Sequence, residues 1–174
     1  MDLLKLLDSV GGVESLGKLA GNLGIDSSKA GDLVGALAPA LMGGMQKQAS
    51  SGSTLSGFKN ALQNGNHQQY LKDPNLMSSA EAVTDGNNIL GHLLGSKDAS
   101  RNVAAQAAES TGIDASLIKK ALPLLAGLVM GAVSKSSDSG KSLDGGSIGN
   151  LLGGLGGDDG FGVDDALDLA KKFF

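Results

Sequence analysis

Cysteine is absent from the 174 residues of this chain, and aromatic side chains are scarce. Without cysteine the chain can form neither a disulfide nor a thiolate metal site. Four Phe, one Tyr and no Trp leave aliphatic side chains, mainly leucine, alanine and methionine, to build the core. The two histidines, His67 and His92, have no carboxylate at metal-ligand spacing. We therefore expect neither a metal nor a cofactor.

Long hydrophobic runs and basic clusters are also lacking. The longest apolar run, 121–133, has 13 residues, whereas a membrane-spanning helix needs ~20. The formal charge is −4, and 13 scattered Lys with one Arg do not form the basic surface that duplex DNA requires. No basic leader precedes the first leucines, which argues against a secretory signal. These absences predict a cytoplasmic protein without a transmembrane segment and argue against nucleic acid as a partner.

What the chain has is leucine at helical spacing. Leucine occurs 28 times, valine and isoleucine together 13 times, and threonine three times. Leucine keeps its rotamers in a helix, whereas β-branched residues favour strands. The chain is therefore predicted to be all-α. Apolar residues at steps of three and four predict helices over 3–10, 13–22, 27–45, 54–62, 75–83, 85–98, 99–110 and 115–133.

Two parts of the chain are similar to each other. Each contains a helix, the sequence Gly-Ile-Asp, and a long helix with an internal proline, Pro39 or Pro123, which we expect to kink it. A glycine inside a helix costs ~1 kcal/mol relative to alanine, and it is retained where two backbones approach closely. We interpret the two parts as related helical hairpins; shared composition is the alternative explanation. Both long helices carry Gly-x-x-x-Gly, at Gly31 and Gly35 and at Gly127 and Gly131.

Composition divides the chain into three regions. An all-α domain is expected over 1–135, with a first hairpin over 1–50, connecting short helices over 51–95 and a second hairpin over 96–135. Residues 136–160 are rich in Gly and Ser, as in a flexible linker. Residues 161–174 form a predicted amphipathic helix that ends in Phe173 and Phe174. Such a helix is able to dock into a groove on its own chain or on a neighbour.

The segment 85–98, DGNNILGHLLGSKD, has one leucine-rich helical face. The opposite face has few side-chain carbons, so that another backbone can lie against it and form hydrogen bonds. We interpret this face as a contact surface for a partner or a second copy. The alternative is an exposed histidine on a short helix with a glycine C-cap. The residues of this face are Asn88, Gly91, His92 and Gly95.

No catalytic motif is present. The sequence SGKS at 139–142 resembles the end of a phosphate loop, but it lacks the first glycine and a preceding strand. No serine has an adjacent base, so we do not expect an enzyme. Residues 99–125 have the shape of a helix-turn-helix, but the second helix offers only Lys119 and Lys120 for reading bases.

The sequence from Val83 to Lys135 resembles the bacterial YidB-like family, a domain-of-unknown-function family. The resemblance rests on the Gly-Asn and Leu-Gly-His residues of 86–92, the Ala-rich helix, the Thr-Gly-Ile-Asp turn and the Leu-Pro-Leu-Leu helix. Residues 1–83 are similar more loosely. The resemblance implies a multihelical fold, a bacterial cytoplasmic setting and no assigned activity, and it supplies no catalytic residues.

The sequence thus predicts an all-α multihelical bundle that acts without catalysis. We expect a protein–protein interaction or self-assembly protein, a homo-oligomer or the partner of another protein. A DNA-binding regulator and a binder of small apolar ligands remain as alternatives. The expected contacts lie at Gly31, Gly35, Gly127 and Gly131, on the face of Asn88, Gly91, His92 and Gly95, and at Phe173 and Phe174.

Overall fold

The computed structural model describes residues 3–50 and 52–136, and within these ranges it contains helices and no strand. The predicted all-α multihelical fold is confirmed. The predicted linker 136–160, apart from Ser136, and the predicted helix 161–174 lie outside the described residues. In chain order the elements are α1 (Leu3–Ser9), α2 (Gly12–Leu23), α3 (Ser27–Ser50), α4 (Gly52–Asn64), α5 (Gln69–Lys72), the 3₁₀ helix η1 (Pro74–Ser78), α6 (Ala80–Leu94), α7 (Lys97–Thr111) and α8 (Ala115–Ser136).

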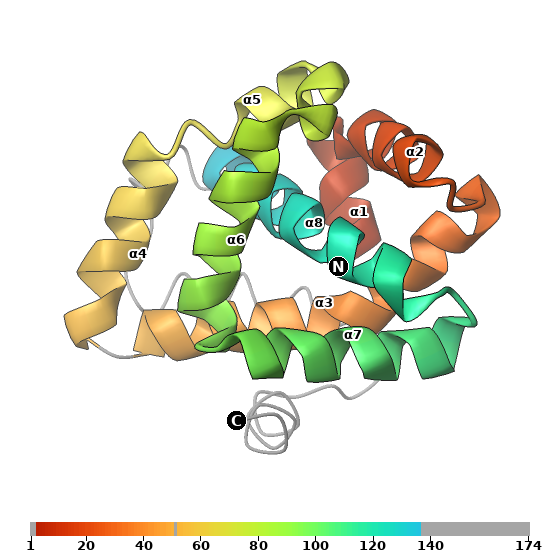
Figure 1. Cartoon of the computed structure of the whole chain (residues 1–174). Coiled ribbons are helices and arrows are strands. Elements are labelled where there is room, and N and C mark those ends of the chain that lie inside the picture. The colour runs from red at the N-terminus through yellow and green to blue at the C-terminus, as the bar shows by residue number, and fades with distance from the viewer. Residues whose placement is uncertain (1–2, 51, 137–174) are drawn as a thin grey trace.

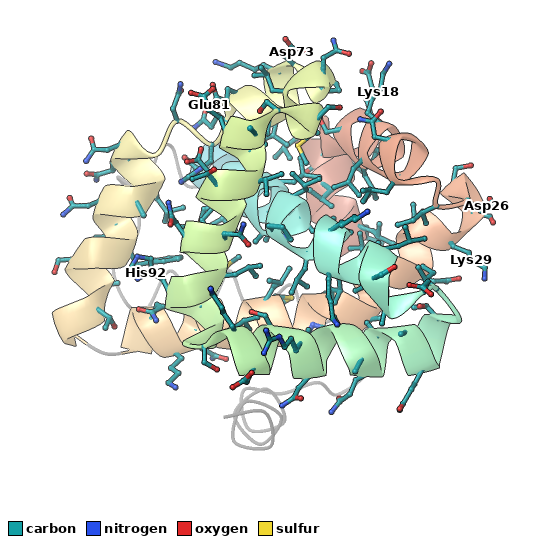
Figure 2. All side chains as sticks on the ribbon, viewed as in Figure 1. Lys18, Asp26, Lys29, Asp73, Glu81 and His92 are labelled. Atoms are coloured by element: carbon teal, nitrogen blue, oxygen red, sulfur yellow. The ribbon has the colours of Figure 1, made fainter. Side chains whose placement is uncertain are left out.

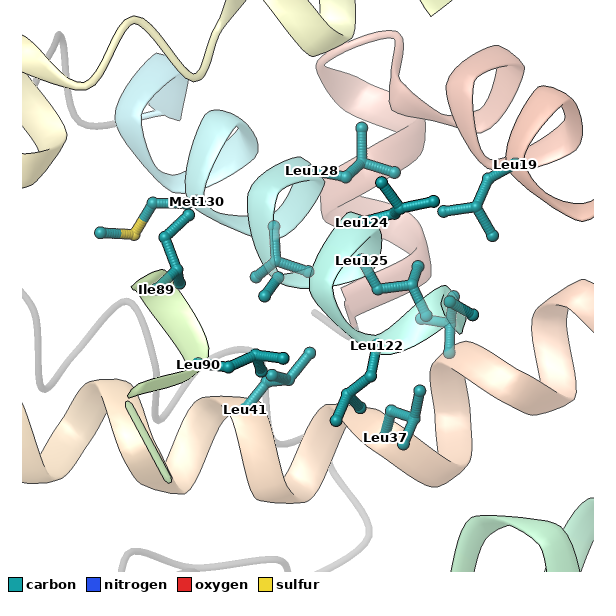
Figure 3. Close-up of a cluster of buried hydrophobic side chains, with 14 of the residues drawn as sticks. Leu19, Leu37, Leu41, Ile89, Leu90, Leu122, Leu124, Leu125, Leu128 and Met130 are labelled. Atoms are coloured by element: carbon teal, nitrogen blue, oxygen red, sulfur yellow. The ribbon is translucent and has the colours of Figure 1, made fainter. Parts of the chain in front are cut away.

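Helix α8 forms the centre of the fold. All residues from Ala121 to Ser134 are buried, and the helix contacts every other described α-helix. Figure 3 shows leucines of α8, such as Leu124 and Leu128, among apolar side chains of α2, α3 and α6. Among the described helices, α8 alone is long and apolar enough to cross a membrane, and 78% of its most apolar stretch is buried inside the fold. Its apolar surface on all sides is what a fully surrounded core helix requires.

The other helices pack around α8. Helices α3 and α7 lie side by side along one edge of the molecule, and α6 runs from them toward α5 and η1 (Figure 1). Helix α4 follows α3 and lies on the outer side of α6 (Figure 1). Helix α2 packs against α8 and η1 more extensively than against α3. Helices α2 and α3 therefore do not pack mainly against each other, as the two helices of a hairpin would. The prediction of two equivalent hairpins is not confirmed.

The two Gly-Ile-Asp sequences form nearly identical turns. Gly24 and Gly112 end α2 and α7 in the left-handed region, at φ 70° and 69°, where glycine is favoured. The isoleucine that follows each glycine is buried, with 6% of its surface exposed in both turns. Asp26 then accepts hydrogen bonds from the backbone and hydroxyl of Ser28, as Asp114 does from Ser116. The similarity seen in the sequence is thus a shared turn that starts α3 and α8.

The predicted boundaries on both sides of 85–98 are wrong. We expected separate helices over 75–83, 85–98 and 99–110, whereas α7 begins at Lys97. The structure has one continuous helix α6 from Ala80 to Leu94, preceded by η1 and capped by Ser79, whose hydroxyl accepts from the Ala82 N–H. Tertiary contacts of α6, described below, explain why residues that favour turns are helical here.

Candidate functional site

The exposed face of α6 is the predicted contact surface. Asn88, Gly91, His92 and Gly95 are all exposed, and together they lie along the last two turns of the helix. A Cβ added at Gly91 would meet no other atom within 4 Å. Gly95 is the C-cap of α6, with φ 79°, and its N–H donates to the Gly91 carbonyl. The structure thus brings the four predicted residues together on one open surface.

The exposed residues of this face after Glu81 carry no formal charge. Beyond Glu81, the one charged residue of α6 is Asp85, which is half-buried and accepts a hydrogen bond from Tyr70. Depletion of charge is the compositional feature that distinguishes the centre of protein interfaces from ordinary surface. The exposed residues of α6 after Glu81 are Val83, Thr84, Asn87, Asn88, Gly91 and His92.

An apolar groove of about 400 Å³ lies next to this face. His92 reaches from α6 toward α4 at its edge (Figure 2). Gln48 of α3 joins the two walls, because its side-chain amide donates to the His92 backbone carbonyl while its backbone carbonyl accepts from the Thr54 hydroxyl. The groove is lined by Gln48, Thr54, Gly57, Phe58, Ala61, Ile89, His92, Leu93 and Met130.

The predicted Gly-x-x-x-Gly pairs lie in different surroundings. Gly127 and Gly131 are buried in α8, where a Cβ at Gly131 would come within 2.5 Å of the His67 carbonyl oxygen. At Gly127 it would lie 3.6 Å from the Tyr70 ring, an ordinary contact. Gly35 is exposed with no atom near its Cβ position, and Gly31 is half-buried beside Leu4 at 3.8 Å. The structure therefore places Gly127 and Gly131 inside the fold and Gly35 on its surface.

Two close backbone contacts lie outside the predicted Gly-x-x-x-Gly pairs, and the one at Gly86 was missed by the sequence analysis. A Cβ at Gly44 of α3 would come within 2.6 Å of the Leu93 carbonyl oxygen of α6. A Cβ at Gly86 of α6 would come within 1.9 Å of the Pro123 carbonyl oxygen of α8. Both glycines are buried, and both allow α6 to lie against a neighbouring helix. Neither belongs to a Gly-x-x-x-Gly pair, so spacing along the chain gave no signal for them.

A buried polar cluster around α5 was also missed. The Tyr70 hydroxyl donates to Asp85 Oδ2 at 2.6 Å, and the Tyr70 carbonyl accepts from Ser15. Burial raises the pKa of the Tyr70 phenol, and the hydrogen bond to Asp85 adds to the shift. The His67 ring stacks near the Tyr70 ring at a centroid distance of 6.5 Å. The cluster ties the polar connection between α4 and η1 to α2 and α6.

His67 itself is 6% exposed. Burial lowers the pKa of its imidazole, and the charge of Asp85 and a hydrogen bond to Ala61 only partly oppose this shift. Its Nδ1 has no hydrogen-bond partner within the described part of the chain. The ring is therefore neutral and enclosed, and it does not line the groove between α4 and α6.

Among residues 3–50 and 52–136, no group of three His, Asp or Glu side chains lies together as a metal site would require. Lys119 and Lys120 are exposed in the second turn of α8, but the helix is buried from Ala121 onward. Apart from its last two residues, only the first two turns of α8 are thus open to a partner, and the rest of the helix lies in the core.

These observations define a small all-helical protein with an uncharged open helix face and a neighbouring apolar groove. The chain belongs to the DUF937 family, described as bacterial proteins of unknown function, whose model matches residues 5–136. This agrees with the resemblance to the YidB-like family. No curated protein and no solved structure matches the chain.

Proposed function

We propose that this protein is a non-enzymatic self-assembly protein, and that the exposed face of α6 contacts the same face of a second copy. The observation that carries the proposal is the uncharged, sparsely covered surface from Val83 to Gly95. Exposed helix faces of monomeric proteins usually carry charged side chains, as the exposed faces of α2 and α7 do. Covering an uncharged face costs less hydration free energy than covering a charged face.

A second copy fits this face better than an unrelated protein. In a two-fold contact each side chain meets its own equivalent or a close neighbour. A charged face would then repel itself, whereas asparagine amides donate and accept and so satisfy one another. Gly91 has open space above it and allows the two helix backbones to approach closely. The exposed Val83, with 40% of its surface accessible, adds an apolar contact at the other end.

The expected association is weak. Helix α6 has 15 residues, so that its face is ~22 Å long at the helical rise of 1.5 Å per residue. A stable complex buries ~800 Å² on each partner, which is more than one helix face provides. The interface therefore includes surface beside α6, and the monomer–dimer equilibrium is expected to respond to protein concentration.

Sedimentation equilibrium of a charge variant tests the proposal. Gly91→Glu places a carboxylate where the two copies meet, and the like charges are expected to weaken association by about tenfold or more, ~1.4 kcal/mol. Gly21→Glu is the matched control, because Gly21 is also an exposed helical glycine with no atom within 4 Å of its Cβ position, but lies on α2. Helical circular dichroism is expected to be unchanged in both. Equal association of the two variants would exclude the α6 face as the interface.

A further inference from the structure

The apolar groove between α4 and α6 has walls and a floor but no occupant among the described residues. Phe58 and Ile89 form its opposite walls, each 6% exposed, and Met130 of α8 contributes to its floor. Its volume of about 400 Å³ is within the range of pockets that enclose large apolar groups. The apolar face of an amphipathic helix, inserted through side chains at i, i+3, i+4 and i+7, is one of the recurring occupants of such a groove.

The chain continues beyond the fold from a point close to this groove. Helix α8 ends at Ser136, six residues after Met130, which is ~9 Å along the helix axis. Residues 137–160 then precede the predicted C-terminal helix. A Gly/Ser-rich chain of this length spans ~27 Å on average, which is long enough for the segment 161–174 to reach the groove of its own chain. Tethering also gives it an effective concentration in the mM range.

The segment 161–174 has the chemistry that the groove accepts. It contains three of the four Phe of the chain, and Val163, Leu167, Ala170 and Phe174 share one helical face. The segment itself contains three Asp and two Lys. None of the residues that line the groove carries a formal charge. The complementarity between the segment and the groove is therefore one of apolar surface.

We infer that the C-terminal segment 161–174 docks in the α4–α6 groove of its own chain, with its apolar side chains against Phe58, Ile89 and Met130. The inference goes beyond the proposed self-association, which centres on Gly91 of the α6 face, although His92 borders both surfaces. The two are separable, because one concerns contacts within a chain and the other contacts between chains.

Paramagnetic relaxation in the full-length chain tests the docking. Since the chain has no cysteine, Ala166→Cys provides a single site for a nitroxide label. In a chain with ¹³C-labelled methionine methyl groups, the Met130 signal is expected to lose most of its intensity. Met77, which is buried in η1 against α2, is expected to be much less affected. A label at Lys18→Cys, an exposed position on α2, is the control and is expected to broaden Met130 less than the label at position 166 does.

A groove-filling variant gives the second readout. Gly57 lines the groove, is exposed and has no atom within 4 Å of its Cβ position, so that Gly57→Leu fills the groove without a clash. It is expected to restore the Met130 signal in the chain labelled at position 166, whereas Gly21→Leu is expected to leave it broadened. Mixing nitroxide-labelled chains with separate methionine-labelled chains is expected to leave Met130 sharp, because docking is intramolecular.

Three results would overturn the inference. One is a sharp Met130 signal in the labelled wild-type chain. Another is broadening that appears only when separate chains are mixed, which would make a second copy the occupant. The third is an apolar small molecule retained in the groove, detected by native mass spectrometry of the freshly purified chain. None of these results depends on whether Gly91→Glu changes sedimentation.

Discussion

Gly86 of α6 lies directly against the backbone of Pro123 in α8, so closely that a Cβ on Gly86 would come within 1.9 Å of the Pro123 carbonyl oxygen. Because both partners are helix backbone, neither can give way as a flexible side chain could. Gly86→Ala is therefore expected to lower the free energy of unfolding by about 3 kcal/mol or more. Chemical denaturation followed by circular dichroism measures this change.

Gly91→Ala is the matched control, five residues further along the same helix. Its Cβ position is open, and alanine favours the helix over glycine by up to ~1 kcal/mol. We expect this variant to be as stable as the wild type or more stable. A Gly86→Ala protein with wild-type stability would show that α6 and α8 are further apart than described.

The two glycines of the α8 Gly-x-x-x-Gly pair are expected to respond differently to alanine. At Gly131 the added methyl group would come within 2.5 Å of the His67 carbonyl oxygen, so Gly131→Ala is expected to cost about 1–3 kcal/mol. At Gly127 it would lie 3.6 Å from the Tyr70 ring, so Gly127→Ala is expected to be tolerated. Denaturation midpoints compare the pair, and equal losses at both positions would contradict the packing of α5 on α8.

The buried His67 predicts a pH-dependent stability. Its pKa is lowered in the fold by burial, whereas an unfolded histidine titrates near ~6.5. Between these two pH values the unfolded chain binds a proton that the folded chain does not. The free energy of unfolding is therefore expected to fall as the pH decreases below ~6.5, by at most ~1.4 kcal/mol per unit, until the folded pKa is reached.

His67→Gln tests this assignment, because glutamine retains an amide donor but does not titrate. Denaturation across this pH range is expected to show a smaller slope for His67→Gln than for the wild type. His92→Gln changes an exposed side chain and is expected to leave the slope unchanged. If the slope followed His92 instead, the buried neutral ring would not be its source.

Much of the fold could be predicted from the sequence, because local signals agree with the packing. Leucine spacing predicted most helices, and the Gly-Ile-Asp sequences predicted where α3 and α8 begin. The failure at Asp85-Gly86 has a tertiary cause. Asp85 accepts the Tyr70 hydroxyl and Gly86 rests on Pro123, and neither partner is near in the sequence. These contacts stabilise a helix where local composition favours a turn.

The candidate site could be predicted only in part. The exposed face of Asn88, Gly91, His92 and Gly95 could be predicted from helical periodicity alone. When the leucine-rich side of a helix is buried, the opposite side is exposed. The close contact at Gly86 could not be predicted, because it depends on a helix that is distant in sequence. The cluster of His67, Tyr70 and Asp85 was missed because its first two members lie in a segment whose polar composition predicts a loop.

The central claim is that two copies associate through an uncharged face of α6. Sedimentation velocity of the wild-type chain over a range of protein concentrations, at low and at high salt, tests it most directly. The account predicts a sedimentation coefficient that rises with concentration and is not reduced by salt, because no ion pairs are screened at such an interface. A monomer at every concentration, or association that high salt abolishes, would contradict it.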